Sequence, residues 1–272
     1  MPAAQDERAE DRAEFLGAFD AQRRGPLAVK MPPGGHEESD GPLYRSWGWA
    51  PRGFVMTTDL ESLGGPELDA LIERQVEFFS ELGSAFEWKT FSHDRTDDLV
   101  GRLVRAGFVP EERESLLIGR VADVDQSPQT PPGVSLRQVH TRSDAERMAE
   151  LLTVVSGEDC SFLGEAFYND AQANPDTVVL LVAEAQGVVV CTARVNLVLG
   201  SEFASLWAGS TLVEWRHQGI YRATVAYRAQ LAAERGLRYL QVDASENSRP
   251  ILERLGFLTV ASTTPYIWSP PH

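Results

Sequence analysis

The chain has 272 residues, with 25 basic and 40 acidic side chains and a formal net charge of −15 at pH 7. Its hydrophobic fraction of 43% is ordinary for a globular protein and excludes general disorder. The negative balance argues against nonspecific binding to nucleic acid or to a membrane surface, because both need a positive field.

Targeting and metal-binding patterns are not found in the sequence. Residues 1–24 mix acids and arginines and contain no apolar segment of the kind that signal peptides carry. The most continuous apolar run, residues 177–183, is too short to cross a bilayer. Two cysteines, Cys160 and Cys191, are too few for a disulfide framework, and no Cys/His spacing indicates a metal. We therefore expect a cytoplasmic protein that holds no metal.

The first half of the chain predicts helices and strands in alternation. A surface loop is expected over residues 31–41, and Gly64-Gly65-Pro66 is interpreted as a simple turn, since no arginine stands beside it in the sequence. The periodicity of apolar residues then predicts a helix over 66–82, a strand over 86–91, a helix over 97–106 and a strand over 114–121.

Residues 123–133 (DVDQSPQTPPG) form the clearest linker, because three prolines and a glycine forbid a helix. The linker divides the chain into a domain of residues 1–122 and a domain of residues 134–272. In both halves a predicted helix ends at a Gly-Phe pair, Gly107-Phe108 and Gly256-Phe257. Two related domains in tandem are the natural inference; a coincidence of two similar element orders is the alternative.

The second half repeats the alternation with stronger patterns. It predicts a hairpin of strands over 177–184 and 188–199, a strand over 203–213, a helix over 220–235, a strand over 238–244, a helix over 248–257 and a strand at 266–268.

The turn Arg216-His-Gln-Gly219 joins the strand at 203–213 to the long helix that follows. In such a turn the backbone N–H groups and the positive end of the helix dipole point at one place, which suits a phosphate group. Five arginines and two glutamates lie between Leu206 and Arg238, so the region is basic within an acidic chain. Arg228 and Arg235 are expected on the solvated face of the helix.

The run Arg216-His-Gln-Gly-Ile-Tyr221 resembles the (Arg/Gln)-x-x-Gly-x-(Gly/Ala) acyl-CoA signature of the GNAT superfamily of N-acetyltransferases. The resemblance covers roughly Val134 to His272, including the hairpin before the signature and the helix that ends in Leu-Gly-Phe. It implies an α/β (α+β) fold with two GNAT-like lobes, each a mixed, mostly antiparallel, twisted sheet flanked by helices. The N-terminal lobe would be a degenerate copy.

The resemblance also implies acetyl-CoA as the acyl donor. The backbone around the end of the signature strand would polarise the thioester, the turn would hold the pyrophosphate, two arginines would add charge, and an asparagine would contact the pantetheine arm. These cofactor-binding candidates are Thr211, Leu212, Val213, Arg216, His217, Gln218, Gly219, Ile220, Tyr221, Arg222 and Asn247.

Two positions depart from the family pattern. Tyr221 replaces the usual small residue, so its ring must turn away from the phosphate or cover part of the cofactor. Leu252 occupies the place of the tyrosine that commonly protonates the leaving thiolate. As catalytic candidates we take Asp243, which strand alternation places on one face with Tyr239 and Gln241, and Tyr266, a substitute acid. The alternatives are a helix cap for Asp243 and a core position for Tyr266.

The acceptor is expected to contact residues 137–176, which combine aromatic and acidic side chains. The sequence therefore predicts an N-acetyltransferase that passes an acetyl group directly to a small-molecule or peptide amine. The alternative is a non-catalytic acyl-CoA sensor or scaffold protein, and a third hypothesis is another nucleotide ligand. The oligomeric state is left open.

Overall fold

The computed structural model describes residues 2–25, 31–61, 63–96, 98–198 and 200–271. Its α-helices are α1 (Pro2–Arg23), α2 (Gly65–Glu81), α3 (Leu99–Arg105), α4 (Arg142–Ser156), α5 (Phe162–Ala173), α6 (Ile220–Glu234) and α7 (Arg249–Arg254). None of the helices in these ranges is both long and apolar enough to cross a membrane.

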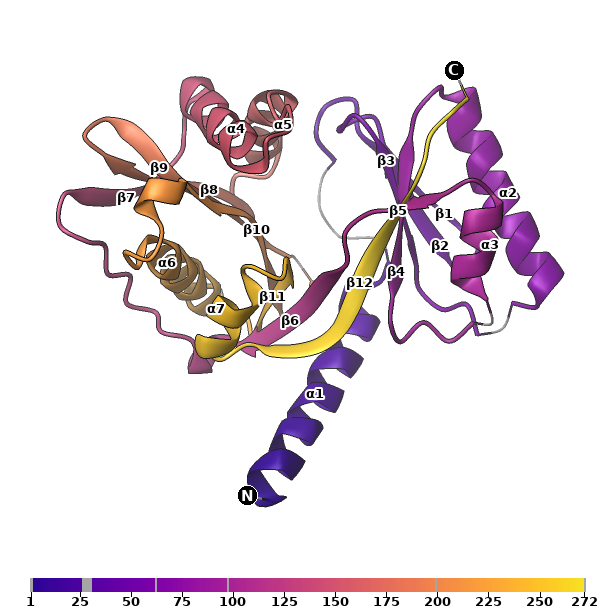
Figure 1. Ribbon diagram of the computed structural model, residues 1–272, viewed down its shortest axis with the longest axis horizontal. Coiled ribbons are helices and arrows are strands. Elements are labelled where there is room, and N and C mark those ends of the chain that lie inside the picture. The colour runs from indigo at the N-terminus through magenta and orange to yellow at the C-terminus, as the bar shows by residue number, and fades with distance from the viewer. Residues whose placement is uncertain (1, 26–30, 62, 97, 199, 272) are drawn as a thin grey trace.

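The strands are β1 (His36–Asp40), β2 (Leu43–Trp47), β3 (Gly53–Thr57), β4 (Phe86–Phe91), β5 (Val109–Pro110), β6 (Glu114–Arg120), β7 (Val134–Gln138), β8 (Val178–Ala185), β9 (Val188–Leu197), β10 (Phe203–Thr211), β11 (Tyr239–Ala244) and β12 (Leu258–Trp268). All belong to one sheet in the order β1-β2-β3-β4-β12-β6-β11-β10-β9-β8-β7, and β5 pairs with β12. The sheet extends through both lobes of the molecule (Figure 1).

The two lobes repeat one motif. In the N-terminal lobe, β3 and β4 are parallel and α2 connects them; in the C-terminal lobe, β10 and β11 are parallel and α6 connects them. The following helices, α3 and α7, both end at a glycine with a positive φ, Gly107 at +91° and Gly256 at +96°. Only glycine adopts this conformation without strain, which explains the Gly-Phe pair at each helix end. The fold is thus two similar α/β lobes in tandem.

The lobes exchange their last strands. Strand β6, from the first half of the sequence, pairs with β11 and β12, which both come from the second half. Strand β12, the end of the second half, pairs with β4, β5 and β6, which all come from the first. Figure 1 shows β12 crossing from one lobe to the other. Each half of the sequence therefore supplies a strand that completes the sheet of the other half.

The register assigns each helix to a face of the sheet. We call face A the side that carries Asn196, Ser205, Gln241, Ile118 and Leu258, each of which is the partner of the next across the strands from β9 to β12. Helices α4 and α5 cover the outer part of face A, and α1 covers its centre. The opposite side, face B, is covered by α2 and α3 in one lobe and by α6 and α7 in the other.

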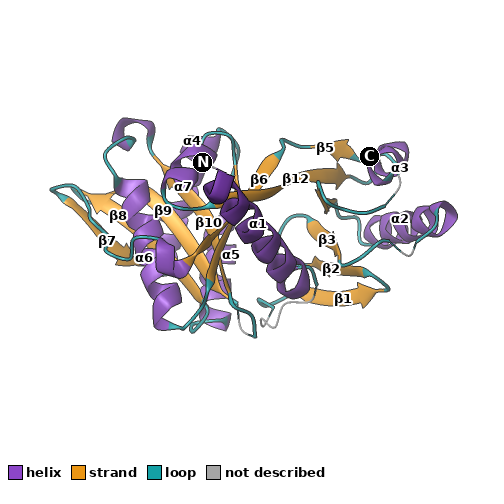
Figure 2. Ribbon diagram, turned by 90° about the horizontal axis from the view of Figure 1, so that it is seen from below, coloured by secondary structure: helices purple, strands orange, loops and turns teal. Residues whose placement is uncertain are grey.

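Helix α1 lies across the junction of the lobes (Figure 2). Its buried Phe15 and Phe19 make edge contacts with Tyr239, Phe91 and Phe203, rings that come from both lobes. The sequence predicts no element there, because charged residues dominate this segment and only a narrow stripe of it is apolar. The helix is held mainly by that stripe, as expected for a helix that packs on one face.

Two sequence-based expectations are wrong. The segment 31–41 is not simply a loop, since β1 pairs along its length with β2. Its sequence, HEESD, shows no apolar alternation because the strand is an exposed sheet edge. Arg228 is not solvated: it is 1% exposed and its Nε donates to the Thr224 carbonyl oxygen at 2.9 Å. Arg235, by contrast, is exposed as expected.

Candidate active site

The turn at residues 216–219 lies between β10 and α6, as the sequence predicts. Gly219 is the N-cap of α6 with a φ of +84°, and His217 also has a positive φ of +62°. A Cβ added to Gly219 would meet no atom within 4 Å, so the space in front of the turn is open. The conformation and the open approach are those of a cradle for an anionic group.

The backbone of this turn has unused donors. Among the described residues, no backbone or side-chain acceptor takes the N–H groups of residues 217–222, and the first bond of the helix runs from Ala223 N–H to the Gly219 carbonyl. Helix α4 differs, because the Thr141 hydroxyl accepts from the Asp144 N–H at its start. Free N–H groups at the positive end of a 15-residue helix fit the phosphate groups of a nucleotide such as CoA.

The predicted side chains surround the turn. Arg216 folds back and its Nε donates to the Thr211 carbonyl oxygen at 3.1 Å, which fixes the turn against the end of β10. Gln218 donates to the Glu214 carbonyl oxygen at 3.2 Å. Arg222 is exposed and its Nη2 lies 3.4 Å from an Asp125 oxygen in the linker. Both arginine side chains are exposed beside the turn.

Strands β10 and β11 separate along the part of β10 that leads to this turn. They pair only through Phe203–Ser205 and Tyr239–Gln241; beyond these residues β10 pairs with β9 alone and β11 with β6 alone. The separating strand β10 also has a bulge between Trp207 and Ser210, where Ala208 has a φ of +51°. In the resulting split each of the two strands keeps its outer neighbour and lacks a partner on its inner side, so inward-pointing backbone groups of β10 line the split.

Tyr221 turns inward rather than toward the phosphate turn. Its ring lies against the bulge, so a Cβ on Gly209 would be 2.8 Å from its Cε2 atom. Burial raises the pKa of Tyr221, although the neighbouring Arg228 opposes the rise. The presence of Tyr221 in place of a small residue thus leaves the turn open, because the tyrosine ring packs against the β10 bulge and not in front of the turn.

We expect Gly209→Ala to lower the free energy of unfolding by about 1–3 kcal/mol, the usual cost of overpacking. In a Tyr221→Leu background the same substitution should cost less, since the clashing ring atom is gone. Gly17, an exposed position of α1 with no atom within 4 Å of a Cβ, gives the control: Gly17→Ala should not destabilise. Urea unfolding of the variants measures this, and equal losses in both backgrounds would contradict the packing of Tyr221 on Gly209.

Asp243 lies at the split on face A and forms an ion pair between the lobes. Its Oδ2 accepts from Lys89 Nζ of β4 at 2.6 Å, and the two side chains are 7% and 9% exposed. Its Oδ1 is buried and has no hydrogen-bond partner among the described residues. The alternation that places Asp243 with Tyr239 and Gln241 is confirmed by the register. Its partner Lys89 was not predicted, because the pair joins the two halves of the sequence.

More acids gather around Lys89. Glu114 Oε2 lies 3.9 Å from Lys89 Nζ, and Arg52 is paired with Glu87 at 3.1 Å. Burial raises the pKa of both Glu87 and Glu114, against the opposing effect of Lys89. Burial also opposes the charge of Lys89, but Asp243 and the two glutamates outweigh it and raise the pKa of this lysine. The junction on face A is therefore a buried, charged site.

The other residues singled out in the sequence lie away from the split or are buried in the core. Tyr266 is on face B of the N-terminal lobe, opposite Trp88 in β4, so the exchange of β12 carries it away from the split. Leu252 is fully buried in the core of the C-terminal lobe. Asn247 is exposed in the turn between β11 and α7. Burial raises the pKa of Cys191 to about 11, so this thiol is an inert core residue.

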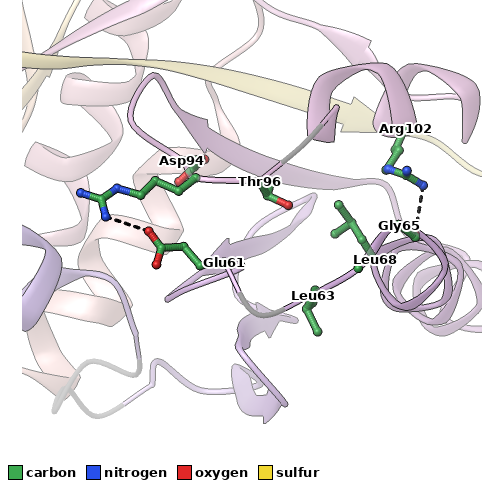
Figure 3. Close-up of a pocket in the computed structure, with 9 residues that line it drawn as sticks. Glu61, Leu63, Gly65, Leu68, Asp94, Thr96 and Arg102 are labelled. Atoms are coloured by element: carbon green, nitrogen blue, oxygen red, sulfur yellow. Dashed lines mark hydrogen bonds and ion pairs between the residues drawn. The ribbon is translucent and has the colours of Figure 1, made fainter.

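The corresponding turn of the N-terminal lobe is closed by its own side chains. The Glu67 carboxylate accepts from the Gly64 N–H at 2.9 Å, and Arg102 Nη1 donates to the Gly65 carbonyl at 2.9 Å. Figure 3 shows this place, beside a pocket of about 730 Å³ that Glu61 and Asp94 also line. The sequence suggested no arginine beside this turn, but the fold brings Arg102 there from α3. A carboxylate therefore lies where the C-terminal lobe has free N–H groups, and its charge disfavours an anion at this turn.

The tandem arrangement, the parallel pair around the split and the open turn together define the GNAT fold. Solved structures with this fold match nearly the whole chain. A GCN5-related N-acetyltransferase from Kribbella flavida is 18% identical with a TM-score of 0.64, and the match covers 97% of this chain and 96% of that one. A tandem GNAT protein from the clavulanic acid biosynthesis pathway is 15% identical with a TM-score of 0.62, over 97% and 96% of the two chains.

A functionally unknown protein from Staphylococcus epidermidis is 12% identical with a TM-score of 0.63, and the match covers 87% of this chain and 95% of that one. No protein-family model and no curated protein sequence matches the chain. The comparisons thus show the fold, in its tandem form.

Proposed function

We propose that the chain is a cytoplasmic N-acetyltransferase that moves an acetyl group from acetyl-CoA directly to an amine. The observation that carries this proposal is the open turn at Gly219, with unused N–H groups on residues 217–222. The split between β10 and β11 begins beyond Ser205 and Gln241, along the part of β10 that leads to the turn, and Asp243 lies at the split on face A. A nucleotide held at the turn would extend its thioester arm into this split.

The chain's own residues would supply positioning and proton transfer. Transfer forms a C–N bond, breaks the thioester C–S bond, takes one proton from the amine and gives one to the thiolate. Backbone N–H groups near the β10 bulge that do not pair with β9 would polarise the carbonyl; the Leu212 N–H is not one of them, because it donates to the Val190 carbonyl oxygen at 3.0 Å. Asp243 Oδ1, which has no partner, would accept the proton of the amine while Lys89 holds Oδ2. Leu252 offers no proton, so solvent would protonate the thiolate.

Isothermal titration with acetyl-CoA tests the proposal. We expect the wild type to bind and Gly219→Glu to lose binding by at least about 100-fold, since a carboxylate would stand where the phosphate belongs. Gly187→Glu is the matched control. Gly187 also has a positive φ, +80°, and open space around it, but it lies in the β8–β9 turn. No binding by the wild type, or equal loss in both variants, would overturn the proposal.

The alternative, an acyl-CoA sensor, is favoured by the buried Leu252 in place of an acid. Release of free thiol from acetyl-CoA in the presence of an amine panel separates the two functions. Binding that depends on Gly219 without thiol release would identify a sensor. Thiol release that needs both the amine and Gly219 would identify the enzyme.

A further inference from the structure

Arg23, the last residue of α1, lies at the base of the split on face A. It is 7% exposed, and its Nη2 donates to the Ser205 hydroxyl at 2.9 Å. That hydroxyl donates in turn to Gln241 Oε1 at 2.9 Å. Ser205 and Gln241 are the last paired residues of β10 and β11. The guanidinium therefore lies at the point where the two strands separate.

Two opposite groups at this point lack partners. Within the part of the chain that the structure describes, Arg23 Nε and Nη1 are buried without a hydrogen bond, and so is Asp243 Oδ1. Asp243 is the carboxylate whose charge acts on Arg23, yet no hydrogen bond joins the two side chains. Its other oxygen is already held by Lys89. Since buried polar groups are nearly always paired in folded proteins, a polar group that bridges Arg23 and Asp243 would satisfy both.

The charge of Arg23 is poorly compensated by its surroundings, and its pKa shows this. Burial lowers the pKa of this guanidinium to about 10, although Asp243 opposes the change. Arg24, the next residue, is treated differently: it donates to the Thr57 carbonyl oxygen and pairs with Asp94. A buried arginine with free N–H groups is a common way to recognise a carboxylate, because the hydrogen bonds are assisted by charge.

We propose that the acceptor is an amino acid, whose carboxylate binds Arg23 and whose amine faces Asp243 Oδ1. The inference rests on the proposed function and names its substrate class. An amino acid carries its amine and its carboxylate on groups bonded to one carbon, which matches one free anionic and one free cationic group side by side. Its ammonium loses one proton to solvent before the transfer, and the neutral amine then gives the second proton to Asp243 Oδ1. A carboxylate at the end of the acyl chain would match Arg23 alone and would be repelled by Asp243, so the acceptor is the better source.

A thiol-release assay tests the inference with leucine, phenylalanine, serine, glutamate and lysine, each compared with its α-amide. We expect kcat/KM for at least one acid to exceed that of its amide roughly 10- to 100-fold, the effect of one charged hydrogen bond. Arg23→Met should bring this ratio close to 1 by lowering the value for the acid alone. Arg23→Lys, which keeps the charge, should retain part of it. Arg24→Met removes a neighbouring arginine that does not contact the split and should leave the ratio unchanged.

Titration of the same acids and amides into the protein gives a readout that needs no turnover. Binding of the acid alone, lost in Arg23→Met, supports the inference. Equal kcat/KM or binding for acids and amides, or no binding of any acid, would mean that water fills the gap, and would overturn it. A preference for succinyl-CoA over acetyl-CoA that disappears in Arg23→Met would assign the carboxylate to the acyl chain and overturn the acceptor. In these cases acetyl-CoA binding at Gly219 still decides the proposed function separately.

Discussion

Residues 1–122 and 134–272, produced separately, are expected to fail to fold, whereas the two produced together should form one stable complex. In the second fragment β12 would lose β4, β5 and β6, which are all its partners in the sheet. In the first fragment β6 would lose both β11 and β12. Tyr266 and Trp268 of the second fragment are also core residues of the N-terminal lobe. Loss of one such buried aromatic costs about 3–5 kcal/mol, and whole domains are stable by only about 5–15 kcal/mol.

The measurement is co-purification of the halves with a tag on one of them, followed by thermal unfolding. As a control, a protease site placed in the linker at residues 126–130 should allow cleavage of the folded protein without dissociation, since this segment contains no strand or helix. Cooperative unfolding of residues 134–272 alone would contradict the interlocking of the lobes. It would also favour two independent domains with the predicted boundaries.

The strands of the second half are the part that the sequence predicts best. Residues 178–185 and 188–197 alternate or run apolar because they are buried on both faces between helix layers. Residues 36–40 were missed since an exposed edge strand needs only backbone pairing. In α6 the small residues lie all round the helix, so periodicity did not reveal that Arg228 faces the sheet. Local patterns thus predict elements whose burial is one-sided or complete, and fail where backbone bonds or small residues dominate.

Only the part of the candidate site that is formed by one continuous stretch of the sequence could be predicted. The turn at Gly219 is continuous in the sequence, and its residues lie where the spacing placed them. Arg23, Lys89 and Asp243 come together from α1, β4 and β11, elements far apart in the chain. The sequence patterns of the exchanged strands β6 and β12 are those of ordinary strands, because side-chain alternation does not encode which strand will be the neighbour. The acceptor side of the site is therefore a product of the tandem topology.

We expect Lys89→Met to lower the free energy of unfolding by about 3 kcal/mol, because it leaves Asp243 buried without its ion-pair partner. Only the more distant charge of Arg23 would then compensate this carboxylate. Asp243→Asn alone should also destabilise the protein. The double variant should lose about 2 kcal/mol less free energy of unfolding than the sum of the two single losses, since neither charge is then left alone. Glu111→Gln is the control: its pair with Arg52 is exposed, and the loss should stay below about 1 kcal/mol.

The pH dependence of stability gives a second test of the Lys89–Asp243 ion pair, because the direction of the change with pH is known. The pKa of Lys89 is raised in the folded protein by Asp243, Glu87 and Glu114. Its contribution to stability is therefore fully present below the ordinary lysine pKa of about 10.4 and is lost as the pH rises through the higher folded value. The difference between wild type and Lys89→Met in urea unfolding should be constant between about pH 7 and 9 and should shrink above it. A coupling energy below about 0.5 kcal/mol between Lys89 and Asp243 would mean that the lysine does not hold this carboxylate. A difference in the free energy of unfolding that grows at alkaline pH would mean the same. Asp243 Oδ2 would then be as free as Oδ1 to face a substrate.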